Sequence, residues 1–131
     1  MNLILFIHED ASNNGELFKK TIDQQFKDLK IDTYRTINSF KEKLKQVSNY
    51  LEKVFILFVD SKNRLDELTS LIDLMERQRI ILILPDNSRP VISASHQFYP
   101  RYFTFMSDTY SDLCAVIDKM TINEKMHAYQ Y

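Results

Sequence analysis

Glycine is almost absent from this chain, since Gly15 is the single one among 131 residues. Phosphate-binding loops of the dinucleotide and Walker types need several glycines, which let the backbone approach a phosphate closely. The chain cannot form such a loop, which argues against nucleotide-binding enzymes of those types. No G-x-S-x-G sequence occurs either, so the strained nucleophile turn of serine hydrolases is absent.

Cysteine is equally scarce, because Cys114 stands alone and can form neither an internal disulfide nor a multi-cysteine metal site. It follows Leu113 in a predicted helix and is most simply a core residue. His96 and His127 show no metal-ligand spacing. An excess of one charge is also missing. The 17 basic and 18 acidic residues leave a net charge of -1, so we expect no nucleic-acid partner.

Long apolar runs are lacking as well. The longest are about six residues, against the roughly 20 that a membrane-spanning helix needs. The first residues enter an apolar run directly, without the basic start and cleavage site of a signal peptide. The length and the hydrophobic share of 44% suit one globular domain. We therefore expect a cytoplasmic protein without a membrane partner, with a domain over residues 1–121 and a helix end or tail over 122–131.

What the chain does contain is a regular alternation of two patterns. Short runs that predict strands lie at residues 3–7, 31–35, 54–59, 80–84 and 102–106. Between them, apolar residues recur every three or four positions, which is typical of amphipathic helices. The faces expected for the first two helices are Leu17, Thr21, Ile22, Gln25, Phe26 and Leu29, and then Phe40, Leu44, Val47 and Leu51.

Later segments continue this alternation. A third helix is predicted from Leu65 to Met75, ending at Arg77, a cation that suits a helix C-terminus. Ser88-Arg89-Pro90 has the form of a helix start, and a short fourth helix is expected to follow it, with Val91, Ile92, Ser95 and Phe98 on its inner face.

The run Val54–Val59 predicts the fold class most directly. Six apolar residues without a break are typical of a strand buried on both faces, as in parallel sheets covered by helices. Five alternating strands and helices predict a three-layer α/β/α sandwich with a five-stranded parallel sheet. The weak second strand belongs at an edge, which gives the flavodoxin-like order 2-1-3-4-5.

In such a sheet, ligands bind at the carboxyl ends of the strands, where the first and third strands meet. His8, Glu9 and Asp10 follow the first strand, and Asp60 and Ser61 follow the third. Carboxylates are preferred ligands of Mg²⁺, so Glu9, Asp10 and Asp60 are a candidate metal site. Asp60 could then accept a phosphoryl group. Alternatively, these acids are solvated loop residues near a helix N-terminus, where acids are favourable.

Over residues 2–120 the chain resembles the receiver domain of two-component response regulators. In that family two acids after the first strand hold Mg²⁺, and His8 and Glu9 stand at their places here. Asp60 stands at the place of the phospho-accepting aspartate. The family's loop after that aspartate, usually with Pro and Gly, is replaced by residues 61–64, Ser-Lys-Asn-Arg.

The resemblance is incomplete at the other strand ends. Leu84 and Pro85 stand where the family has a Ser or Thr that bonds the phosphoryl group, and neither has a hydroxyl. Met106 and Ser107 stand where it has Lys followed by Pro, and a methionine cannot supply the cation. The chain thus resembles an atypical, or pseudo-, receiver. The resemblance implies a signalling module that is not an enzyme, has disabled or weak phosphorylation, and binds other proteins.

An aromatic segment over residues 98–103 is the candidate partner surface, because Tyr and Arg are enriched at protein interfaces. The resemblance implies that a partner, including a second copy of the chain, binds the face of the fourth helix, fifth strand and fifth helix. The candidate residues are Tyr99, Arg101, Tyr102, Phe103 and Tyr110, of which Phe103 matches a switching aromatic of the family. Alternatively, the tyrosines shield a short helix, and Phe103 fills the core with Phe105.

Two other families compete with this interpretation. Mannose-type phosphotransfer IIA domains carry a phosphorylated histidine after the first strand and an aspartate after the third, and His8 and Asp60 fit those places. The glycine that follows this histidine and the Gly-Gly-Ser-Pro-like loop after the third strand are absent here. The acid-rich loop after the first strand also resembles TIR-like domains, whose longer, glycine-containing second loop is missing.

Overall fold

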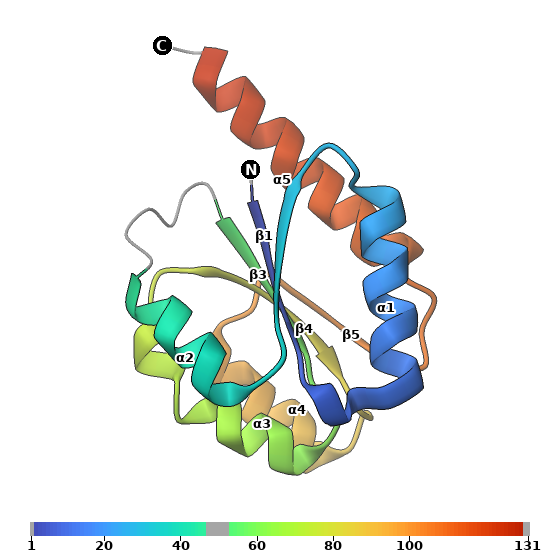
Figure 1. Cartoon of the computed structure of the whole chain (residues 1–131), viewed down its shortest axis with the longest axis vertical. Helices are drawn as coiled ribbons and strands as arrows, with labels where there is room; N and C mark the ends of the chain where they lie inside the picture. The colour runs from blue at the N-terminus through green and yellow to red at the C-terminus, as the bar shows by residue number, and fades with distance from the viewer. Residues whose placement is uncertain (1, 47–52, 130–131) are drawn as a thin grey trace.

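A computed structural model describes residues 2–46 and 53–129. The chain forms one parallel sheet of five strands in the order β2-β1-β3-β4-β5 (Figure 1). The strands are β1 (Asn2–Ile7), β2 (Lys30–Tyr34), β3 (Lys53–Phe58), β4 (Arg79–Leu84) and β5 (Tyr102–Phe105). The helices are α1 (Ser12–Gln25), α2 (Ile37–Gln46), α3 (Lys62–Thr69), α4 (Arg89–Ser95) and α5 (Ser111–Tyr129). This order confirms the predicted flavodoxin-like fold.

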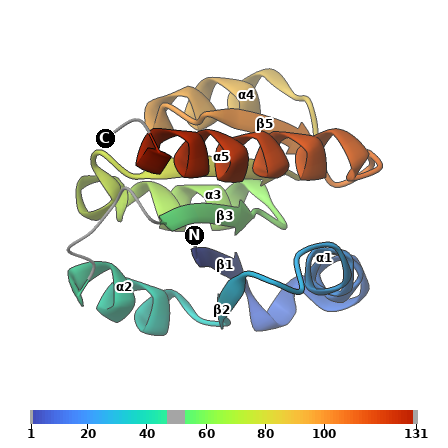
Figure 2. The same cartoon turned by 90° about the horizontal axis from the view of Figure 1, so that it is seen from above.

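Helices cover both faces of the sheet, as the apolar runs predict. In Figures 1 and 2, α1 and α5 lie on one face, and α2, α3 and α4 lie on the other. Alternate residues of β3 enter the two cores. Phe55 and Leu57 pack with the α2–α4 side, and Ile56 and Phe58 pack with the α1–α5 side. All four are fully buried, which explains why this strand shows no polar alternation.

The packing of α1 depends on its one glycine and differs in detail from the prediction. A Cβ on Gly15 would lie 2.8 Å from Ile7 Cγ2, so the missing side chain lets α1 approach β1 closely. The prediction that Leu17 faces the core is wrong, since this residue is 61% exposed. Phe18 is fully buried instead and stacks on Phe58 with ring centroids 5.5 Å apart. The predicted inner residue Gln25 is exposed as well, and the buried residues of α1 are Gly15, Phe18 and Ile22.

The predicted third helix is broken after Thr69, where hydroxyls compete for its last carbonyls. Thr69 Oγ1 donates to the Leu65 carbonyl at 2.8 Å, and Ser70 Oγ donates to the Glu67 carbonyl at 2.6 Å. The chain continues as a 3₁₀ turn, η3 (Ile72–Met75). Arg77 is not a helix end as predicted. It adopts a left-handed backbone conformation with φ 69°.

The remaining helix and 3₁₀ turns connect the strands. The fourth helix is formed as expected, with Pro90 in its first turn, and it leads into the 3₁₀ turn η4 (His96–Phe98). Another 3₁₀ turn, η1 (Glu9–Ala11), joins β1 to α1. The predicted face residues Val47 and Leu51 lie outside the described residues. In the described part of the chain, no helix has the length and apolar character to cross a membrane.

Candidate functional site

The carboxyl ends of β1 and β3 meet beside each other at the centre of the sheet. Ile7, the last residue of β1, pairs with Phe58, the last residue of β3. His8 and η1 follow β1, while Val59 and Asp60 follow β3 before α3 begins. The predicted strand-end residues are thus brought to one edge of the sheet, where doubly wound proteins place their sites.

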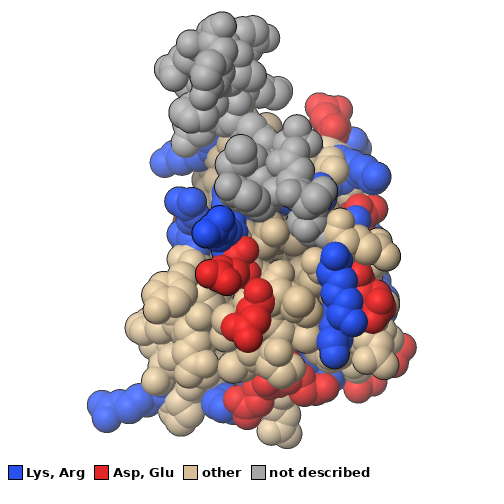
Figure 3. Space-filling model, turned by 90° about the vertical axis from the view of Figure 1, so that its left-hand side faces the viewer, with Lys and Arg blue, Asp and Glu red and all other residues tan. Residues whose placement is uncertain are grey.

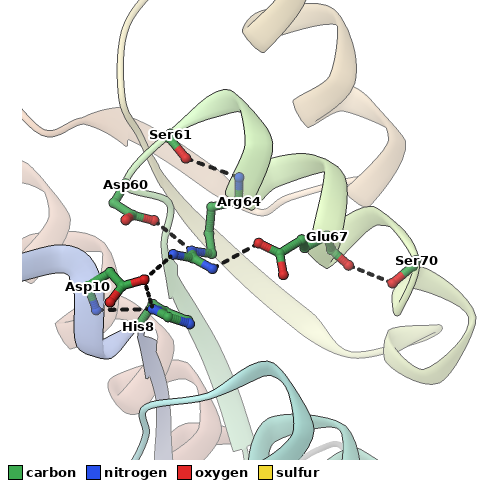
Figure 4. A network of polar contacts seen from close by, with 7 residues as sticks. All are labelled: His8, Asp10, Asp60, Ser61, Arg64, Glu67 and Ser70. Atoms are coloured by element: carbon green, nitrogen blue, oxygen red, sulfur yellow. Dashed lines mark hydrogen bonds and ion pairs between the residues drawn. The ribbon is translucent and has the colours of Figure 1, made fainter.

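Asp60 is held by Arg64, a residue that the sequence analysis did not single out (Figure 4). Ser61 caps α3 and accepts a hydrogen bond from the Arg64 backbone N–H at 3.1 Å. This cap starts the helix immediately after Asp60, so the Arg64 side chain lies one turn further on and reaches back. Its Nε donates to Asp60 Oδ1 at 2.9 Å.

The Arg64 guanidinium also joins two other acids, which makes it the centre of the network. Its Nη1 donates to Glu67 Oε1 at 2.8 Å, and its Nη2 lies 3.5 Å from Asp10 Oδ2. The Arg64 side chain is only 11% exposed and that of Asp60 17%. A planar guanidinium suits this position, because it can address three carboxylates from one place.

The charge of this arginine is secured by its neighbours. Burial lowers the pKa of Arg64, but the hydrogen bond that Arg64 donates to Asp60 and the charges of Asp60, Glu67 and Asp10 outweigh burial and raise the pKa above its ordinary value. Arg64 therefore stays charged throughout the range in which proteins fold. The guanidinium of Arg64 is thus a permanent positive charge beside Asp60, at the carboxyl end of β3.

His8 lies in the same network, and one of its ring nitrogens is engaged. The Asp10 backbone N–H donates to His8 Nδ1 at 3.0 Å, and Asp10 Oδ2 lies 3.5 Å from the same nitrogen. The His8 side chain is mostly buried, and its ring lies 6.2 Å from that of Phe6.

The predicted magnesium site of Glu9, Asp10 and Asp60 is not assembled. Among the described side chains, those of residues 2–11, 13–46 and 53–121, no group of three His, Cys, Asp or Glu is placed to hold a metal ion. Arg64 stands between two of the expected ligands and bonds to Asp60 directly. Glu9 is exposed on the 3₁₀ turn. The physical reason is that the Arg64 guanidinium lies between Asp10 and Asp60, where a metal ion would have to bind both carboxylates.

The ends of β4 and β5 complete this edge of the sheet. Leu84 is fully buried, and Pro85 follows it half-buried. The Met106 backbone N–H donates to the Leu84 carbonyl at 2.9 Å, and its side chain packs against the core on the α1–α5 side. Ser107 is exposed beside it. The Met106 side chain that follows β5 thus packs against the core and brings no charge to the site.

The five candidate interface residues lie before, on and after the edge strand β5, and they differ in exposure. Tyr99 is 89% exposed, and with the exposed Arg101 it lies before β5, at the amino end of that strand. Tyr102 packs partly into the core on the α1–α5 side, while Phe103 is exposed and contacts Phe105 edge to face. Tyr110 lies past the carboxyl end of β5, where its ring packs on Phe18 at 5.0 Å.

On one face of the molecule, the charges of both signs are mixed (Figure 3). Figure 3 shows one face of the molecule, on which acidic and basic side chains lie close to one another and among uncharged residues. That face offers no extended surface of a single sign.

Comparison with known proteins identifies the fold. No protein-family model matches the chain, and no curated protein matches it. A CheY-like protein from Pseudomonas aeruginosa is similar in structure, with a TM-score of 0.63 and 13% identity, covering 92% of this chain and 99% of that one. The signal receiver domain of an HD domain-containing protein from Pseudomonas fluorescens has a TM-score of 0.66 and 9% identity, covering 99% and 93%.

A response regulator receiver domain protein from Methanospirillum hungatei is also similar, with a TM-score of 0.61, 15% identity, and 95% of each chain covered. The fold of this chain is therefore receiver-like, as its strand order and its strand-end acids predict. Identities this low establish a common fold and do not transfer a function.

Proposed function

We propose that this chain is a receiver-like regulatory module that acts by binding a protein partner and does not use phosphorylation of Asp60. One observation carries the proposal: the Asp60 carboxylate is already bound by Arg64, through Nε at 2.9 Å. A phosphoryl acceptor must present a carboxylate oxygen to the donor. It also needs a cation and hydrogen-bond donors that offset the charge of the transferred group. Here the guanidinium of Arg64, on the helix that follows Asp60, already binds the acceptor carboxylate.

The neighbouring strand ends support the proposal, because they lack the groups that would stabilise a phosphoryl aspartate. Leu84 and Pro85 have no side-chain donor, and Met106 has no charge. To attack a phosphoryl donor, the Asp60 carboxylate would therefore have to give up its hydrogen bond to Arg64. Leu84, Pro85 and Met106 would supply no side-chain hydrogen bond or charge to the phosphoryl group in exchange. We propose no catalytic step for the module, and we assign its activity to recognition of another protein.

The test is phosphorylation by small donors. The protein is incubated with Mg²⁺ and either acetyl phosphate or phosphoramidate, and its intact mass is measured. The expected result is no adduct on the wild-type chain. Asp66→Ala is the matched control, because Asp66 is an exposed acid on α3 that forms an ion pair with Lys62 at 2.6 Å.

Two outcomes would contradict the proposal. A base-labile adduct that persists in Asp66→Ala and disappears in Asp60→Ala would show that Asp60 accepts phosphate. An acid-labile, base-stable adduct that disappears in His8→Ala would favour the phosphocarrier hypothesis, in which His8 is the nucleophile.

A further inference from the structure

We draw no further inference here: the strongest candidate, the pocket of about 570 Å³ between the turns that precede β4 and β5, is lined by apolar side chains and by exposed charges of both signs, and nothing in the structure shows what occupies it.

Discussion

Replacing Arg64 with methionine tests the network at the strand end, because methionine keeps the unbranched stem and removes the guanidinium. The contacts that this substitution removes contribute different amounts to the free energy of unfolding. The bond to Asp60 spans 2.9 Å between side chains that are 11% and 17% exposed, and a charge-assisted hydrogen bond of this kind contributes about 1.5–3 kcal/mol. Glu67 is half exposed, so its contact adds at most about 0.5 kcal/mol. Arg64→Met should therefore cost about 2 kcal/mol of unfolding free energy.

A double-mutant cycle isolates the pair itself. Asp60→Asn, Arg64→Met and the double variant are compared by urea unfolding at neutral pH, and we expect a coupling energy of about 1–2 kcal/mol. Lys62 and Asp66 form the matched control, since they are an i,i+4 pair on the same helix at the shorter distance of 2.6 Å but are exposed. Their coupling should stay below about 0.5 kcal/mol. Equal coupling in both cycles, or additivity at Asp60 and Arg64, would refute the reasoning.

Three further predictions concern packing and pH. Gly15→Ala should destabilise the fold by about 1 kcal/mol in urea unfolding. The new Cβ would lie 2.8 Å from Ile7 Cγ2, and this overpacking exceeds the gain of about 1 kcal/mol in helix propensity. Phe18→Ala should cost about 3–5 kcal/mol in thermal or urea unfolding, and Leu17→Ala less than about 0.5 kcal/mol; similar losses would contradict the observed face of α1. Burial, followed by the charge of a nearby aspartate, raises the pKa of Tyr110 above its unfolded value near 10. The stabilisation is complete below about pH 10 and is lost as the pH rises through the folded pKa, so Tyr110→Phe should reduce the loss of stability that urea unfolding measures above about pH 10.

The fold could be predicted from the sequence because the inner strands are buried on both faces. Such burial removes polar alternation and leaves continuous runs such as Val54–Val59, while the mixed composition of residues 31–35 marks an edge strand. Helix detail was less predictable. Leu17 and Phe18 are adjacent apolar residues, and only the close approach of α1 at Gly15 decides which is buried.

The candidate site could be predicted in part. The position of Asp60 follows from the end of a buried strand, whereas Arg64 was missed. A signal for it exists, because Ser61 is a helix-capping residue and an arginine in the first turn after such a cap can reach back to the preceding acid. The pocket has no such signal. Its walls come from segments about twenty residues apart, and nothing in the sequence marks Arg77 or Tyr99 as left-handed.

The most direct test of the central claim is a titration with beryllofluoride and Mg²⁺ followed by amide NMR. Beryllofluoride binds an available carboxylate as a phosphoryl mimic, so the measurement does not depend on the rate of any phosphate donor. With Asp60 held by Arg64, we predict no saturable shift at Asp60, Ser61 or Arg64. Saturable shifts at these residues that vanish in Asp60→Ala would contradict the claim that this receiver-like module works without an aspartyl phosphate.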